Sequence, residues 1–173
     1  GGGHMSGRES EAVLVTSYAN SACYGVVLFC WFGRSYGLAV THDKTTVIAA
    51  KIDGAQPWRK AVADDALTYT DWQRGNYFKA VAECIPNRGR VGIEFDNVPV
   101  ERLSALKQAL PNVEFVDIAA SCMKMRMIKS AEEIDLIAHG AQVCDSGRAA
   151  RVAAHTEGRP EPEAATDATQ GSV

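Results

Sequence analysis

Apolar and polar residues alternate in short runs along the first two thirds of the chain, and runs of this kind predict β-strands. Residues 42–44 lie between the second and third runs and have the length and polarity of a hairpin turn. The predicted strands are residues 11–16, 36–41, 45–51, 67–70, 90–94 and 113–118. The first half of the chain therefore predicts a meander of strands.

Helical spacing of apolar residues separates the later strands. Residues 74–84 follow Asp71, a suitable N-cap, and residues 99–109 begin at Pro99, which suits the first turn of a helix. Residues 17–29 fit either a helix or a strand, and we interpret them as a helix. The alternation of strand and helix predicts an α/β fold in which helices flank a mixed β-sheet.

The last third of the chain predicts a long helix. Ser130 and Glu133 form a capping box, and the residues behind it carry one apolar face. That face consists of Ile134, Ile137, Ala141 and Cys144. Before this helix, methionines alternate with basic residues over 123–129, which predicts one buried and one solvated face.

Both ends of the chain differ from the rest in composition. Residues 1–5 read GGGHM, which is typical of a cloning remnant. Residues 158–173 are rich in Pro, Ala, Thr and Glu, which predicts a polar tail or linker. We therefore expect one folded domain over residues 6–157.

Composition and charge exclude several classes of protein. The 173 residues are 46% hydrophobic and 23% charged, with a net charge of −3, so nothing resembles the basic surface of a nucleic-acid binder. No apolar run reaches the roughly 18 residues that would span a bilayer, so no membrane partner is expected. The five cysteines are widely spaced and lack a CxxC motif, which favours reduced thiols in a cytoplasmic protein. We expect most of them to be small core residues.

Two loop segments contain residue types that can bind a ligand. Residues 31–37 combine aromatic side chains, two glycines and Arg34, whose guanidinium can present a rigid fork to a carboxylate. Residues 52–59 read IDGAQPWR. An amphipathic turn with a surface arginine, followed by a plain loop, fits the same residues.

The chain carries no recognisable catalytic or metal-binding motif. We expect His42, His139 and His155 to lie on the surface or in packing contacts rather than in a catalytic site. A less favoured alternative is a thiol nucleophile, Cys23 or Cys144, activated by His155.

Five short motifs together resemble the creatinase family of creatine amidinohydrolases, which belongs to the creatinase, prolidase and Xaa-Pro aminopeptidase superfamily. They occur in the family's order over about residues 13–150. The motifs are FGR at 32–34, IDGAQPWRK at 52–60, YTDWQRGNYF at 69–78, VGIEFD at 91–96 and MKMRMIKSAEE at 123–133.

The resemblance implies a small N-terminal α/β domain with a ribonuclease H-like motif. Such enzymes hydrolyse creatine to sarcosine and urea without a metal or other cofactor, and their catalytic histidine lies in a larger C-terminal domain. They are dimers in which the N-terminal domain of one subunit reaches over the active site of the other. The family's substrate-contacting residues fall on Phe32 and Arg34, and no catalytic residue falls on this chain.

The sequence also departs from the family. It lacks the helical segment that precedes the first strand in the family, residues 160–173 are polar, and residues 19–23 are small where the family is tyrosine-rich. Either an excised and redesigned domain or a divergent natural homologue fits these differences. The main hypothesis is an amidinohydrolase N-terminal domain that is inactive alone. The alternative is an engineered scaffold or interaction module that self-associates or binds a partner through the former domain interface.

Overall fold

The computed structural model describes residues 10–25, 34–53, 62–70, 72–73, 75–154 and 166. The chain divides into two compact units, Gly1–Arg126 and Met127–Val173. The first unit contains the sheet, and the second contains one long helix.

A six-stranded mixed sheet forms the first unit, which confirms the predicted fold class. The strands lie in the order β4-β3-β2-β1-β5-β6. Their bounds are β1 Ala12–Val15, β2 Gly37–Thr41, β3 Thr45–Ala50, β4 Asp65–Tyr69, β5 Gly89–Ile93 and β6 Val113–Asp117. Each predicted strand is present, with its ends shifted by two residues or fewer.

Strand direction brings several chain segments to one edge of the sheet. β1, β5 and β6 run parallel to one another, and β3 runs parallel to β4. β2 is antiparallel to both of its neighbours, β1 and β3. The start of β2 therefore lies beside the carboxyl ends of β1 and β3, at what we call the carboxyl edge.

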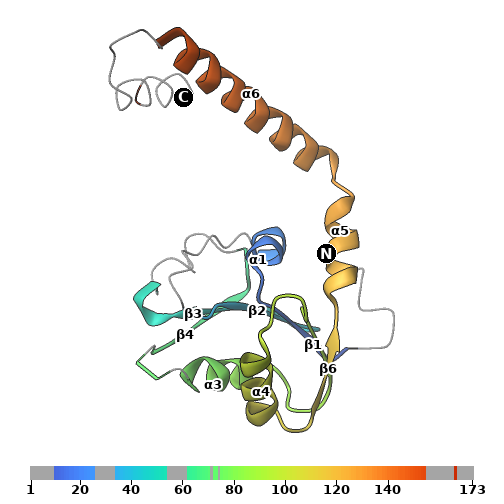
Figure 1. Ribbon diagram of the computed structural model, residues 1–173. Coiled ribbons are helices and arrows are strands. Elements are labelled where there is room, and N and C mark those ends of the chain that lie inside the picture. Colours follow the sequence, from blue (N-terminus) through green and yellow to red (C-terminus); the bar gives the residue numbers. More distant parts are fainter. Residues whose placement is uncertain are drawn as a thin grey trace. The chain divides into compact units, whose positions relative to one another are not determined.

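Helices cover both faces of the sheet (Figure 1). The helices α3 (Gly75–Cys84) and α4 (Val100–Ala109) lie together on one face, and α1 (Tyr18–Gly25) lies on the other. Tyr77 and Val81 of α3 and Leu106 of α4 are fully buried against the strands. The predicted helical spacing of α3 and α4 is thus confirmed, with Pro99 at the start of α4.

Two glycines of β5 fit places where a larger side chain would meet its neighbours. Gly89 has φ +68, a left-handed conformation that favours glycine. A Cβ atom on Gly92 would lie 2.7 Å from Cγ2 of Ile118. Both glycines lie in the parallel part of the sheet, where β5 fits between β1 and β6.

The helix α5 (Ala119–Met127) corrects the interpretation of the methionine-rich segment. Alternation predicted one buried and one solvated face, but Met123, Met127 and Ile128 are exposed. Cys122 is the buried residue of this helix. A period of two does not follow a helical face, so the alternating methionines scatter around the helix.

The helix α6 (Ala131–Ala154) begins at the predicted capping box. The backbone N–H of Ser130 donates to Glu133 Oε2 at 2.8 Å, and the backbone N–H of Glu133 donates to Ser130 Oγ at 3.2 Å. The apolar face predicted here is present but exposed, since Ile134 and Ile137 keep 55% and 59% of their surface. No helix within the described ranges is long and apolar enough to cross a membrane.

The cysteines also differ from expectation. Cys122 is buried and Cys84 is half-buried, whereas Cys23 and Cys144 are exposed. The prediction that most cysteines are core residues is wrong for Cys23 and Cys144, which α1 and α6 present to solvent. Cys30 lies outside the described residues, as do residues 158–165 and 167–173 of the predicted tail.

Candidate functional site at the carboxyl edge of the sheet

Two charged residues mark the carboxyl edge of the sheet. Glu94 directly follows β5, and Arg34 lies three residues before β2. In open α/β sheets, ligands bind beyond the carboxyl ends of the strands. A ligand site is therefore expected at this edge.

Glu94 is the centre of a buried hydrogen-bond network. Its side chain is 1% exposed. Oε2 accepts hydrogen bonds from the backbone N–H of Thr16 at 2.6 Å and of Ser17 at 2.8 Å. Oε1 accepts from the Ser17 hydroxyl and from the Asn20 side-chain amide. The carboxylate is thus bound entirely by the segment that begins α1.

The network keeps Glu94 ionised. Burial on its own would raise the pKa of this carboxyl group, but the hydrogen bonds from Ser17, Thr16 and Asn20 outweigh burial and lower it. The N-terminus of α1 adds the positive end of a helix dipole beside the carboxylate. Glu94 therefore fixes the start of α1 to the end of β5.

The same network reaches α5. Arg126 donates from Nη1 to Asn20 Oδ1 at 3.1 Å, and Asn20 donates in turn to Glu94. The Tyr24 hydroxyl lies 3.8 Å from the sulfur of Met125. These contacts attach α5 to α1, so the Glu94 network has a structural role, and its acceptors already have donors.

The segment Arg34–Tyr36 is held differently, by tyrosine hydroxyls. Tyr69 at the end of β4 donates to the backbone carbonyl of Ser35 at 2.7 Å. Tyr77 of α3 donates to the backbone carbonyl of Tyr36 at 3.2 Å. These two bonds fix the backbone on which the Arg34 side chain is mounted.

Tyr36 itself contacts an acidic residue. Its hydroxyl donates to Asp53 Oδ2 at 2.5 Å, and Asp53 ends the short 3₁₀ helix η1 (Lys51–Asp53). Burial, together with the Asp53 carboxylate, raises the pKa of Tyr36, whereas the positive charge of Arg34 acts in the opposite direction. Arg34, Tyr36 and Asp53 thus form one electrostatic group.

The structure places the predicted binding residues as follows. Arg34 is half-buried. Phe32 and Trp31, and residues 54–59 of the second predicted segment, lie outside the described residues. Asp53, the second residue of that segment, is the part brought next to Tyr36.

The remaining candidates show no comparable arrangement. His42 and His139 are exposed, and His155 lies outside the described residues. Cys23 and Cys144 are exposed free thiols, and they belong to different units of the chain. Within the described residues, no group of three or more His, Cys, Asp or Glu side chains could hold a metal ion.

Comparisons with known proteins decide the family. Residues 3–128 match the Creatinase/Prolidase N-terminal domain. The chain belongs to this family. It is 41% identical to the Creatinase of Bacillus sp. (strain B-0618) over 174 residues, which cover 98% of this chain and 42% of that protein. The chain therefore spans less than half the length of this curated relative.

Solved structures support the same fold at lower identity. The X-Pro aminopeptidase of Thermotoga maritima has a TM-score of 0.71 at 15% identity, covering 94% of this chain and 46% of that one. The Creatinase/Prolidase N-terminal domain of an X-Pro dipeptidase from Streptococcus pyogenes has a TM-score of 0.58 at 15% identity, covering 66% and 87%. The creatinase/prolidase N-terminal fold thus accommodates very different sequences.

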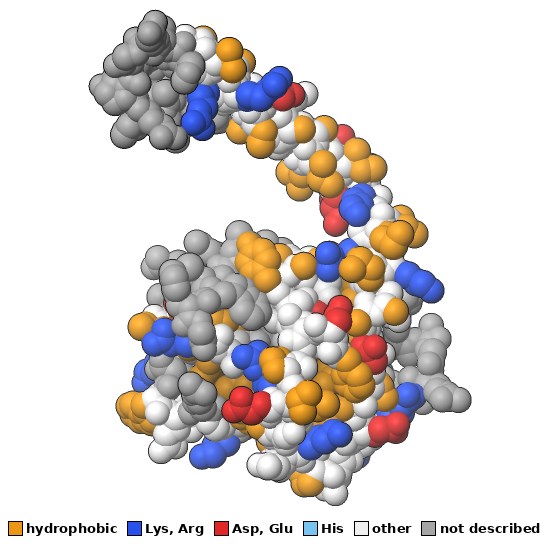
Figure 2. Space-filling view, viewed as in Figure 1, with side chains coloured by type: hydrophobic (Ala, Val, Ile, Leu, Met, Phe, Trp, Pro, Cys, Tyr) orange, Lys and Arg blue, Asp and Glu red, His pale blue; other side chains and the backbone are white. Residues whose placement is uncertain are grey.

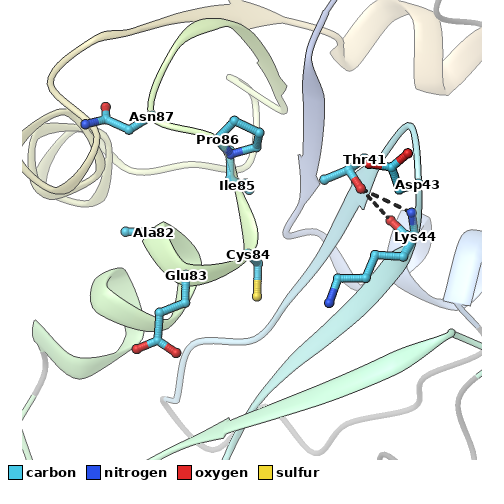
Figure 3. Close-up of a pocket in the computed structure, with 9 residues that line it drawn as sticks. All are labelled: Thr41, Asp43, Lys44, Ala82, Glu83, Cys84, Ile85, Pro86 and Asn87. Carbon is cyan, nitrogen blue, oxygen red and sulfur yellow. Dashed lines mark hydrogen bonds between the residues drawn. The ribbon is translucent and has the colours of Figure 1, made fainter.

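This member of the creatinase/prolidase N-terminal family also has a pocket away from the carboxyl edge of the sheet (Figure 3). The pocket lies between the turn joining β2 to β3 and the end of α3, and Thr41, Lys44 and Cys84 contribute to its lining. Burial raises the pKa of the Cys84 thiol to about 11, so this sulfur stays protonated at neutral pH. Lys44 is paired with Asp65 at 3.0 Å. The pocket is open and lacks an activated group, so it carries no chemistry.

Sequence reasoning missed the partners at the carboxyl edge. Glu94 lies inside the VGIEFD motif, but its burial depends on Thr16 and Ser17, which are more than 70 residues away in the chain. The Tyr36–Asp53 hydrogen bond joins the two segments that sequence analysis had singled out separately. The sequence pointed to both segments as candidate binding loops, but the spacing between them along the chain did not predict that Tyr36 contacts Asp53.

Proposed function

We propose that this chain is the N-terminal domain of a creatinase-like amidinohydrolase, whose whole reaction converts creatine and water into sarcosine and urea. In this proposal Arg34 and Phe32 contact the substrate, with Arg34 bound to its carboxylate. Four observations support the proposal: the family membership, the 41% identity to a creatinase, the order of the five motifs, and the placement of Arg34.

The single observation that carries the binding role is the anchored but accessible position of Arg34. Tyrosine hydroxyls bind the backbone carbonyls of Ser35 and Tyr36, directly after Arg34, while the Arg34 side chain keeps part of its surface. A guanidinium on a fixed backbone loses little freedom when it binds a carboxylate in its planar fork. Arg34 thus suits the binding of an anionic ligand.

The chain alone is proposed to be inactive, and no catalytic residue or cofactor is assigned to it. Breaking a carbon–nitrogen bond of the guanidino group needs a base that activates water and an acid that protonates the leaving nitrogen. Among the described residues at the carboxyl edge, Glu94 is buried and hydrogen-bonded, and Asp53 is bound by Tyr36. Orientation of a carboxylate by Arg34 leaves most of the barrier in place.

An assay of urea and sarcosine release tests this proposal. The chain is incubated at high concentration with creatine, and Arg34→Ala serves as the control. We expect no turnover above background for either protein. Turnover that Arg34→Ala abolishes would place a complete active site in this chain and would contradict the proposal.

A second candidate function is an interaction module, with a second copy of this chain as the partner. Apolar side chains on α6 favour it, since Ile134, Leu136 and Ile137 are each more than half exposed and Figure 2 shows apolar side chains along this helix. Size-exclusion chromatography with light scattering distinguishes a monomer from a dimer. A concentration-dependent dimer that Ile134→Glu dissociates supports self-association through α6, and a monomer at all concentrations contradicts it.

A cytoplasmic location is also proposed. The four described cysteines are free thiols, even though Cys23 and Cys144 are exposed. Exposed free thiols persist in a reducing compartment. A test is alkylation of the purified protein without reductant. Cys23 and Cys144 are expected to react with the reagent as free thiols.

A further inference from the structure

We infer that Gly37 is a positioning residue for the segment that carries Arg34: the space left by its missing side chain lets the Tyr77 hydroxyl reach the backbone carbonyl of Tyr36. Gly37 is the first residue of β2 and lies three residues after Arg34. The inference rests on the proposed function, because it deepens the binding role given to Arg34. Gly37 lies outside the five motifs and outside the substrate contacts that the resemblance implies.

The space beside Gly37 is bounded by buried atoms. A Cβ atom at this position would lie 2.9 Å from the hydroxyl oxygen of Tyr77 and 3.1 Å from Cδ1 of Leu14. Tyr77 is 1% exposed and Leu14 is fully buried, so neither side chain can turn into solvent to make room. Gly37 has no positive φ, unlike Gly89, so space rather than backbone conformation is the reason for glycine here.

Two packed tyrosines hold the two backbone carbonyls that directly follow Arg34. Tyr69 donates to the carbonyl of Ser35 at 2.7 Å, and Tyr77 donates to the carbonyl of Tyr36 at 3.2 Å. The rings of Tyr69 and Tyr77 pack edge-on with their centroids 5.7 Å apart, so each ring supports the other. An arginine on a held backbone loses less freedom when it binds a ligand. The space beside the Tyr77 hydroxyl is therefore part of what positions the arginine.

The alternative role for Gly37 is close packing of β2 without any effect on Arg34. The two roles predict different results when Gly37→Ala is combined with Tyr77→Phe, which removes the oxygen that the new Cβ would meet. In both cases the double variant should be more stable than Gly37→Ala. If Gly37 positions the segment, the double variant still binds creatine weakly, because the Tyr36 carbonyl still lacks its phenol donor. If Gly37 only allows packing, creatine affinity recovers together with stability.

The test is a creatine titration of the 15N-labelled 173-residue chain, followed at the Arg34 Nε–H signal in NMR spectra, with thermal unfolding of every variant. We expect Tyr77→Phe and the double variant to bind creatine about three-fold more weakly than the wild type, less than the full effect of one hydrogen bond because a second phenol still holds the segment. The matched control is Gly92→Ala in β5, whose Cβ would lie 2.7 Å from Cγ2 of Ile118. The control should lower stability as Gly37→Ala does and leave creatine affinity unchanged.

Two results overturn the inference. One is wild-type creatine affinity in Tyr77→Phe or in the double variant. The other is a loss of stability in Gly37→Ala that Tyr77→Phe does not relieve, including the case in which neither Gly37→Ala nor the double variant folds.

A wild type that binds no creatine would contradict the substrate role of Arg34 and not the role of Gly37. Hydrogen exchange without ligand then decides: amide exchange over residues 35–37 must be faster in Tyr77→Phe and in the double variant than in the wild type, and unchanged in Gly92→Ala. Equal exchange rates in all of these proteins contradict the inference by themselves.

Discussion

Glu94 and Arg34 lie at the same edge of the same sheet, but their charged groups differ in burial and in hydrogen bonding. Glu94 is 1% exposed, and donors from Thr16, Ser17 and Asn20 occupy its oxygens. Arg34 keeps part of its surface, and the chain instead fixes its backbone through Tyr69 and Tyr77. A buried charge that is fully hydrogen-bonded stabilises one fold, whereas a charge on an anchored backbone with accessible surface can exchange partners.

Removal of Glu94 and removal of Arg34 should lower the stability of the fold by very different amounts. Removal of Glu94 strands several buried donors at once, and an unsatisfied buried group costs about 1–3 kcal/mol. Removal of a partly exposed arginine side chain strands far less. Stability should therefore depend strongly on Glu94 and weakly on Arg34, while ligand binding should show the reverse.

The largest expected effect is that of Glu94→Ala. We expect the free energy of unfolding to fall by about 3 kcal/mol or more, because the backbone N–H groups of Thr16 and Ser17 and the Asn20 amide lose their acceptor. Chemical denaturation measures this. The matched control is Glu114→Ala, since Glu114 lies on β6 and contacts Arg90 at 3.6 Å with 70% of its side chain exposed. The control should lose less than about 1 kcal/mol. Equal losses would remove the contrast between buried and exposed carboxylates.

A second prediction concerns pH. The folded-state pKa of Glu94 is lowered, so its contribution to stability is complete above the unfolded value of about 4.3 and is lost as pH falls through the folded-state pKa. Glu94→Gln cannot ionise, so this acid-dependent part should be absent from its stability profile. Denaturation at a series of pH values from about 7 to about 3 tests the point. A profile for Glu94→Gln as steep as that of the wild type would mean that other carboxyl groups dominate.

The strands were predictable from sequence because alternation and turn residues are local signals. The prediction succeeded for β1 to β6, and the Ser130–Glu133 capping box was also confirmed, since both of its residues lie within one helical turn. The alternation over residues 123–129 predicted a buried face that is absent, because periodicity without a tertiary partner does not determine which residues are buried. The Glu94 network and the Tyr36–Asp53 bond join residues that are distant in the chain, so only the fold could bring them together.

A smaller effect is expected for Tyr69→Phe. The ring still packs edge-on to Tyr77, whose centroid is 5.7 Å away, but the hydrogen bond to the Ser35 carbonyl is lost. We expect a loss of about 1 kcal/mol in stability, together with faster hydrogen exchange of the amides near Ser35. Tyr24→Phe, which loses weak contacts to the sulfur atoms of Met125 and Cys122, is the control. If both variants behave alike, the anchoring of the Arg34 segment by Tyr69 is not significant.

The smallest expected effect on stability is that of Arg34→Ala. Because Arg34 is partly exposed, we expect its removal to change the free energy of unfolding by about 0.5 kcal/mol or less. Thermal and chemical unfolding measure the change. A loss of several kcal/mol would show that Arg34 is a structural ion-pair member like Glu94, and the functional half of the comparison would fail.

The most direct measurement of the central claim is a creatine titration of the 15N-labelled chain, followed residue by residue in NMR spectra. The account predicts weak, saturable shifts that are largest at Arg34, Tyr36, Asp53 and Tyr69, small at Thr16 and Glu94, and absent in Arg34→Ala. Shifts that are largest around the Cys84 pocket, or that persist unchanged in Arg34→Ala, would contradict it.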